Sequence, residues 1–513
     1  MTFNSGAAGK ILALTLPPIS LNSKIYAPAQ IFATIALGVL MIWLPLPGAL
    51  LLVTGAIFFI VTLLNPVAGL YALIPVIPFS SLLAVEMAGV RVGLMELVLL
   101  FTLAAWGLKI LTRPPALRRF LRGGPLLPLF LLFLGAISLS WPASFSLGAS
   151  LVEIIKWVEM LALYLLVINL LSPRQIKWVV AFILLAGLAQ ALLGLYQFVF
   201  KVGPPGFELF GGRFLRAYGT FAQPNPYGGY LGLVLPLALS LTLWSISQIP
   251  KSIIQTFTNK TYLLFKLILV SLPLGLLLAA LFASQSRGAW LGFAAAAVVI
   301  FTLRTKKSAA MMTGLFVTII LIALAGSFDF TIAPGDSADE NTAYTAVTQR
   351  FVDALEIITI SDVSNTPVTD ANFAIIERLA HWQAARAMWQ DNPWLGVGFG
   401  NYAVVYPAYA VGRWLDPLGH AHNYLLNLGA EGGLVGIMAY IIFWIFVFGL
   451  LWAAIRRSQN FYQAVALGAL GIIVHLHVHN LVDNLYVQGM YLHITIILGL
   501  GSIIYLQSRP VAS

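Results

Sequence analysis

Long apolar blocks are the feature that most constrains how this chain can fold. They recur along nearly all of its 513 residues. Each is about 17–25 residues long, the length that a helix needs to cross the hydrocarbon core of a membrane. The composition agrees, because 60% of the residues are hydrophobic and only 9% are charged, whereas soluble domains carry roughly 25% charged residues. The sequence therefore predicts an all-α polytopic membrane protein with about 12–14 transmembrane helices.

The blocks divide the chain into predicted spans and one long loop. The spans are expected at residues 28–44, 47–64, 66–85, 93–111, 124–141, 151–171, 177–200, 227–246, 262–283, 289–303, 308–326, 433–455, 461–478 and 486–506. This gives four parts: a cytoplasmic segment 1–27, N-terminal transmembrane helices 28–326, an extracytoplasmic loop with interfacial helices 327–432, and C-terminal transmembrane helices 433–513. Within the loop, a 3.6-residue apolar stripe predicts a helix that begins near Phe373 and ends at Asn392-Pro393.

The basic residues predict the orientation. The densest basic loop contains Arg113, Arg118, Arg119 and Arg122, so we expect it in the cytoplasm. Counting spans from it places both termini inside, and every other loop then predicted to be cytoplasmic also carries positive charge. The net charge of +10 is therefore interpreted as a topology signal and not as a nucleic-acid surface. The chain has no cysteine, which excludes disulfides and thiolate-bound metals.

Most of the unusual polar residues fall in the segments predicted to be outside. Ionisable groups at membrane depth are costly and by default mark a functional site. The candidates are Arg213, Arg216, Asn225, Arg287, Arg378, His420, His422, Asn423 and Asp483. The guanidinium group of arginine binds diphosphate oxygens without losing its charge, and a histidine beside it can accept a proton from an attacking hydroxyl. The set favours glycosyl transfer from a lipid diphosphate. No Asp-x-Asp pair occurs, which favours a metal-independent mechanism without a cofactor.

Each of these residues also has a simpler interpretation. An arginine near a helix end, such as Arg213, often only reaches toward lipid headgroups. On a helix His475 and His479 share a face, which indicates either a metal pair or, more commonly, two buried histidines. Glu431 could cap the helix that follows it. Three tyrosines of the loop fit either sugar stacking or an aromatic interface belt; they are Tyr402, Tyr406 and Tyr409.

With the pattern that begins at His422, the sequence resembles the O-antigen ligase and O-antigen polymerase family of bacterial envelope glycosyltransferases. The ligase pattern is His-Asn, nine residues and Gly-x-x-Gly, and here it is His422-Asn423, YLLNLGAEG and Gly433-Leu-Val-Gly436. Three further stretches are similar to this family: RAYGTFAQPNPYGGYL (216–231), SRGAWLGF (286–293) and RLAHWQAARAMWQDNPWLGVGFGNY (378–402). The resemblance extends from about Leu126 to Leu506.

The resemblance implies a C-type-like glycosyltransferase of the bacterial inner membrane with an extracytoplasmic active site. Its partners would be an undecaprenyl-diphosphate-linked glycan donor, a lipid or glycan acceptor and membrane lipids. Carried over by position, Arg287 and Arg378 would bind the diphosphate and His422 would be the base. Arg216 and Asn225 would belong to the substrate site. Arg213, Asn423, His420 and Asp483 complete the expected substrate-binding set.

Three other functions remain open at this stage. A polymerase of the same family would use the same donor but extend another lipid-linked repeat unit. A small-anion transporter, for instance of bicarbonate, would be expected to show internal repeats and broken helices that meet at mid-membrane, and the sequence shows no such symmetry. A scaffold with a signalling loop would leave the arginines at separate span ends unexplained.

Overall fold

The structure is a computed structural model. It describes residues 46–82, 84–87, 90–112, 122–209, 212–249, 260–305, 310–311, 363–364, 366–368 and 372–508. The predicted span at 28–44, nearly all of the one at 308–326 and most of the acidic part of the long loop lie outside these residues. Three arginines of the densest basic loop also lie outside them; they are Arg113, Arg118 and Arg119.

The chain separates into two compact units, Met1–Val61 and Thr62–Ser513. The described part of the first unit belongs to a single helix, α2, which runs over Leu46–Leu64. The proposed functional residues all belong to the second unit. The predicted four-part division of the chain stays a prediction.

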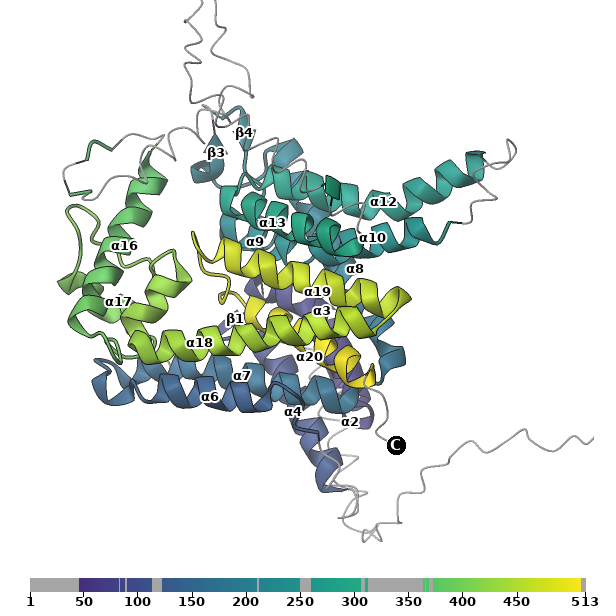
Figure 1. The fold of residues 1–513 in the computed structure, drawn as a ribbon, viewed down its shortest axis with the longest axis horizontal. Coiled ribbons are helices and arrows are strands. Elements are labelled where there is room, and N and C mark those ends of the chain that lie inside the picture. Colours follow the sequence, from purple (N-terminus) through teal and green to yellow (C-terminus); the bar gives the residue numbers. More distant parts are fainter. Residues whose placement is uncertain are drawn as a thin grey trace, which may run out of the picture. The chain divides into compact units, whose positions relative to one another are not determined.

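The second unit is a bundle of apolar helices (Figure 1). The helices are α3 (Pro66–Phe79), α4 (Leu94–Leu111), α6 (Leu127–Ser138), α7 (Leu147–Leu170), α8 (Ile176–Phe200), α9 (Pro224–Gly232), α10 (Leu235–Ser247), α12 (Lys260–Ala283), α13 (Arg287–Arg304), α16 (Phe373–Asp391), α17 (Tyr402–Val405), α18 (Tyr424–Arg457), α19 (Asn460–His479) and α20 (Met490–Gln507). Two short antiparallel hairpins accompany them, β1 (Ala84–Met87) with β2 (Val90–Gly93) and β3 (Glu208–Leu209) with β4 (Phe214–Leu215).

The predicted fold class is confirmed. Among the described residues, eight helical stretches are long and apolar enough to cross a membrane, and three shorter apolar helices accompany them. α19 packs against α10, α13 and α18, and α20 packs against α7 and α18. The residues of α20 from Met490 to Ile504 are all buried, so this helix is surrounded by protein over most of its length.

One predicted span, 227–246, is broken into α9 and α10. Pro236 is the second residue of α10, and because proline has no N–H it cannot continue the hydrogen-bond ladder from the preceding turn. The break leaves α9 as a short helix whose glycines lie against other elements. A Cβ atom at Gly229 would come within 2.3 Å of Leu485 and 3.3 Å of His479. Glycine at this position therefore lets α9 approach the end of α19 closely.

α18 begins earlier than predicted and is kinked at Gly433. The residue has φ 59° and ψ −159°, which interrupts the helix between Tyr424 and Arg457. The freed N–H of Leu434 donates to the Pro393 carbonyl at 2.8 Å, and a Cβ on Gly433 would lie 2.3 Å from the Trp394 carbonyl carbon. The first glycine of the Gly-x-x-Gly pattern thus allows the segment after α16 to dock on α18.

The amphipathic helix predicted in the long loop is present as α16. Its buried face includes Ile376, Leu379 and Met388, it packs against α18, and Asn392 forms its C-cap as expected. Its location in the membrane interface stays a prediction. Together, α16 and the kinked α18 hold the residues between them, 392–423, against the bundle.

Candidate active site

Two turns, 420–424 and 480–485, are joined by hydrogen bonds and form the centre of the site. The Tyr424 N–H donates to the Asn480 carbonyl at 2.8 Å, and the Asn423 side-chain amide donates to the Leu481 carbonyl at 3.0 Å. Asn423 also caps α18, because its side-chain oxygen accepts from the Leu426 N–H. The structure therefore gives Asn423, predicted to bind substrate, hydrogen bonds that hold the two turns together.

This arrangement places Asp483 between two histidines. One carboxylate oxygen lies 3.5 Å from His422 Nδ1 and the other lies 3.9 Å from His479 Nε2. Asp483 is buried, with 7% of its surface exposed. Burial alone raises the pKa of its carboxyl, but the contacts with His422 and His479 outweigh this and lower the pKa well below its ordinary value. Asp483 is thus a carboxylate that faces the predicted base.

The backbone of His422 is strained. Its φ is 50°, a left-handed conformation that residues other than glycine and asparagine rarely adopt. The Trp382 indole donates to its carbonyl at 3.3 Å and its own N–H donates to His420 Nδ1 at 3.1 Å. Strain of this kind is maintained only where the surroundings fix it, and it is common at functional sites.

Arg378 and the start of α13 meet the same turn from two sides. Arg378, on α16, donates through Nε to the Val482 carbonyl at 3.1 Å. Arg287 is the first residue of α13, and a side chain on the adjacent Gly288 would collide with Val482 at 2.7 Å and contact His479 at 3.2 Å. The structure therefore brings the elements that carry Arg287 and Arg378 to the neighbourhood of Asp483.

Arg216 and Asn225 are directly paired. Arg216 Nη2 donates to Asn225 Oδ1 at 2.7 Å, and its Nε donates to the Ser284 carbonyl at 3.0 Å. Ser284 lies three positions before Arg287, so these bonds attach the Arg216 guanidinium to the turn that leads into α13. In contrast, Arg213 is exposed and stacks 5.9 Å from the ring of its neighbour Phe214.

His420 and His381 stand beside His422. The ring centroids of His420 and His422 are 4.5 Å apart, and those of His381 and His422 are 5.9 Å apart. Burial, with a smaller effect of the neighbouring His422, lowers the pKa of both His420 and His381 to about 4. His381 Nδ1 is 2.8 Å from the Tyr402 hydroxyl. Both flanking histidines are therefore neutral near neutral pH.

Three of these residues could also hold a metal ion. Ligand atoms of His420, His422 and Asp483 lie within 4.8 Å of one another, and two histidines with a carboxylate are a known ligand set for zinc and iron. His475 and His479 are both buried. Among the described residues, the ligand atoms that lie close enough together to hold a metal ion are those of His420, His422 and Asp483. The structure therefore favours the interpretation of His475 and His479 as two buried histidines.

Two further sequence interpretations were wrong. Glu431 does not cap its own helix, since it accepts a hydrogen bond at 2.9 Å from the Tyr402 N–H at the start of α17. Tyr402 and Tyr406 are fully buried, so neither is exposed for sugar stacking or for an interface belt. Tyr406 donates instead to the Trp414 carbonyl at 2.8 Å, and both rings pack beside His381.

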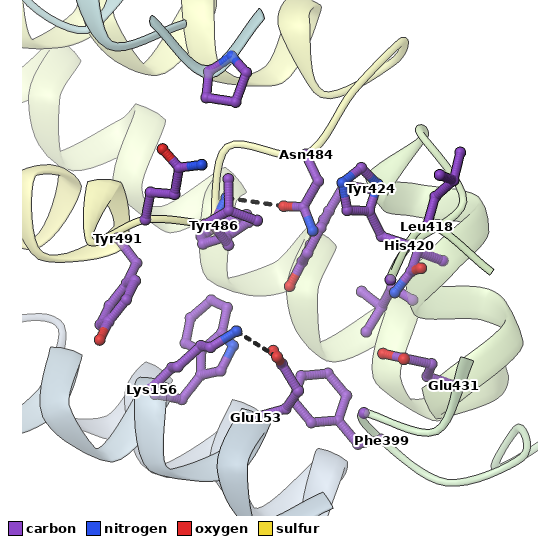
Figure 2. A pocket seen from close by; sticks show the side chains of 18 of the residues that line it. Glu153, Lys156, Phe399, Leu418, His420, Tyr424, Glu431, Asn484, Tyr486 and Tyr491 are labelled. Atoms are coloured by element: carbon purple, nitrogen blue, oxygen red, sulfur yellow. Dashed lines mark hydrogen bonds and ion pairs between the residues drawn. The ribbon is translucent and has the colours of Figure 1, made fainter. Parts of the chain in front are cut away.

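A cavity of about 360 Å³ adjoins His420 (Figure 2). Glu153 and Lys156 of α7 form an ion pair within it, and Glu431 approaches it from α18. The sequence interpretation missed Glu153 and Lys156 because it searched the loops. A signal was present, since Glu153, Lys156 and Glu159 are charged residues inside one predicted span, 151–171.

One comparison with known proteins found a family match. Residues 272–441 match the model of the O-antigen ligase family. This part of the chain is similar to the O-antigen ligases. The resemblance to this family is confirmed, and the match supports a membrane glycosyltransferase role with a lipid-linked glycan and membrane lipids as partners. A search among curated proteins found no match.

The O-antigen ligase match runs from α12 to beyond the kink in α18. It contains Arg287, Arg378 and His422, whereas Arg216 and Asp483 lie outside it. Arg216 is connected to the matched part by its hydrogen bond to Ser284, and Asp483 by its contact with His422. Together with the apolar helices, the match supports a multi-pass bacterial membrane protein.

Proposed function

We propose that this chain transfers a glycan from undecaprenyl diphosphate to an acceptor hydroxyl, as an O-antigen ligase, at the extracytoplasmic face of the bacterial inner membrane. One observation carries the proposal: the His422–Asp483 pair and the elements bearing Arg287 and Arg378 converge on the 480–485 turn. Glycosyl transfer from a lipid diphosphate needs cations at the leaving group and a base at the nucleophile, and this convergence provides both.

The arginines are proposed to bind the donor diphosphate. A guanidinium makes paired, charge-assisted hydrogen bonds to phosphate oxygens and stays charged in a low-dielectric setting. Arg378 reaches the turn from α16, Arg287 begins α13, whose first turn lies against Val482 and His479 at Gly288, and Arg216 is attached to the turn before α13. Negative charge grows on the diphosphate as the bond to the sugar breaks, so the arginines would stabilise the transition state more than the bound donor.

His422 is proposed as the base. The acceptor oxygen forms a bond to the anomeric carbon, the bond from that carbon to the diphosphate oxygen breaks, and the hydroxyl proton passes to the His422 ring. The lipid diphosphate leaves with the bonding electron pair. Asp483 would orient the ring through Nδ1 and stabilise the imidazolium that forms, as the carboxylate of a catalytic triad does. No cofactor takes part in this scheme.

Transfer in proteoliposomes tests the proposal. The probe is an undecaprenyl-diphosphate oligosaccharide with a glycolipid acceptor, and the variants are Arg287→Ala, Arg378→Ala and His422→Ala. Removing a charge-assisted contact costs about 1.5–3 kcal/mol, so each arginine variant should lose roughly 10- to 100-fold in kcat/KM. Arg413→Ala is the matched control, because Arg413 is exposed and stacks on Trp414.

The size of the reaction product distinguishes a ligase from a polymerase, and a failure to use the donor would contradict the proposal. A single addition to the acceptor identifies a ligase, whereas a ladder of repeat units identifies a polymerase. If folded wild type neither binds nor consumes a cognate donor, the proposal is wrong. Uptake of bicarbonate by sealed vesicles would then favour the transporter.

A further inference from the structure

The cavity beside His420 differs in its residues from the arginine cluster (Arg216, Arg287 and Arg378). Of the described residues that line it, the one with a basic amino or guanidinium group is Lys156, and neither Arg287 nor Arg378 is among them. Lys156 is already paired with Glu153. The described lining therefore has no free cation for a diphosphate, and the cavity fits a ligand without negative charge.

The uncharged part of the lining has the chemistry of a sugar site. Trp157, Tyr424 and Tyr486 supply aromatic surface, and the amides of Gln223, Asn484 and Gln488 supply donors and acceptors. A pyranose ring has apolar C–H faces and a polar rim of hydroxyls, so it matches a pocket of aromatic rings with a few placed polar groups. The volume of about 360 Å³ is within the range of small-molecule sites.

Gln488 gives an independent indication of a ligand. Its Oε1 is buried and has no hydrogen-bond partner among the described residues, and its backbone is left-handed with φ 49°. Buried polar atoms are nearly always satisfied. Gln488 lines the cavity, so its unsatisfied acceptor is a candidate partner for a hydroxyl that arrives with the ligand.

The position of the cavity relative to the histidines indicates that it binds the acceptor sugar and not the donor sugar. His420 lines the cavity, and the ring of His422 is 4.5 Å from that of His420. Arg378 instead binds the carbonyl of Val482, which is not among the lining residues. An incoming hydroxyl and a departing diphosphate lie on opposite sides of the reacting carbon, so a sugar in the cavity is on the nucleophile's side.

We propose that this cavity is the acceptor subsite, which holds the sugar ring whose hydroxyl is glycosylated, with Gln488, Glu153 and Gln223 as determinants of acceptor specificity. The proposal rests on the glycosyltransferase function proposed above. It assigns a place to the acceptor, which the arginine cluster does not provide.

Acceptor and donor kinetics test this assignment. The acceptor probe is the envelope glycolipid of the source strain, and the variants are Gln488→Ala, Gln223→Ala and Glu153→Gln. Each should raise the acceptor KM about tenfold, the loss of one hydrogen bond, while the donor KM changes less than twofold. Gln248→Ala and Glu208→Gln are the matched controls, because both residues lie outside the cavity and are exposed. A rise in the donor KM alone would show that the cavity holds a donor sugar and would overturn the proposal.

A binding measurement separates this inference from the proposed function. The soluble oligosaccharide released from the same glycolipid by mild acid is titrated against the full chain in nanodiscs, without donor. Binding that weakens about tenfold in Gln488→Ala and Gln223→Ala supports the subsite, even if wild type transfers no glycan. Equal binding by wild type and both variants would overturn it, even if transfer is observed.

Discussion

Replacing Asp483 with asparagine tests the proposed base most directly, because the change keeps the shape of the side chain and removes its charge. In the structure the carboxylate lies 3.5 Å from His422 Nδ1. At an effective dielectric constant of about 20, two unit charges at this distance attract by about 5 kcal/mol. This is an upper figure for how much Asp483 stabilises the imidazolium formed during transfer, and it corresponds to a loss of at most roughly 5 × 10³-fold in kcat.

The substitution also changes the hydrogen bonding at His422. An asparagine amide can donate to Nδ1, which would place the ring proton on Nε2 and leave the base unable to accept one. We therefore expect kcat to fall on the order of 10³-fold while the donor KM stays within about threefold.

The assay is steady-state glycan transfer in proteoliposomes from pH 5 to 9, with the melting temperature measured in parallel. Asp391→Asn is the control, because Asp391 is exposed and contacts only Tyr409 among its described hydrogen-bond partners. A loss of less than tenfold in kcat in folded Asp483→Asn would refute the role of the pair.

Three other results are expected. Transfer should continue in excess chelator because the arginines supply the positive charge; loss of activity that zinc or manganese restores would instead assign a metal to His420, His422 and Asp483. The folded chain keeps His381 neutral (pKa about 4) and the unfolded chain protonates it near 6.5. The free energy of unfolding should thus fall as pH drops from 6.5 to 4, by at most about 3 kcal/mol. It should fall less in His381→Gln, and an equal pH dependence of unfolding in wild type and variant would contradict this. Gly433→Ala should lower the free energy of unfolding by more than about 2 kcal/mol, because φ is positive and the new Cβ would meet Trp394. Gly449→Ala, in open space on the same helix, is the control and should be neutral or stabilising. Equal melting temperatures of the two variants would argue against a packed kink.

Much of the fold could be predicted because membrane spans are a local property. A helix in lipid must satisfy its own backbone hydrogen bonds, so length and hydropathy alone located helices such as α8, α12 and α19 to within a few residues. The prediction was wrong where backbone geometry depends on a partner. The break between α9 and α10 occurs at Pro236, which hydropathy does not register, and the kink at Gly433 accompanies contacts with the distant segment at Pro393 and Trp394.

The site was predictable in its residue types and only partly in its arrangement. Arginine and histidine at span ends were costly enough to indicate function, and the structure brings Arg216 to Asn225 and His422 to Asp483. Capping by Asn423 was not predictable, because a cap depends on where the helix starts. Nor did it indicate that Tyr402 would be buried against His381.

By itself, the sequence determined that this protein is a helical membrane protein with a glycosyltransferase-type domain. Hydropathy, charge and the His-Asn…Gly-x-x-Gly spacing are all properties of the linear sequence. Only the tertiary structure decided that Asp483 faces His422 across two turns, and that Glu153, Glu431 and Gln488 line one cavity. These residues lie far apart in sequence, and the packing of α7, α18 and the 480–491 segment alone sets the distances between them.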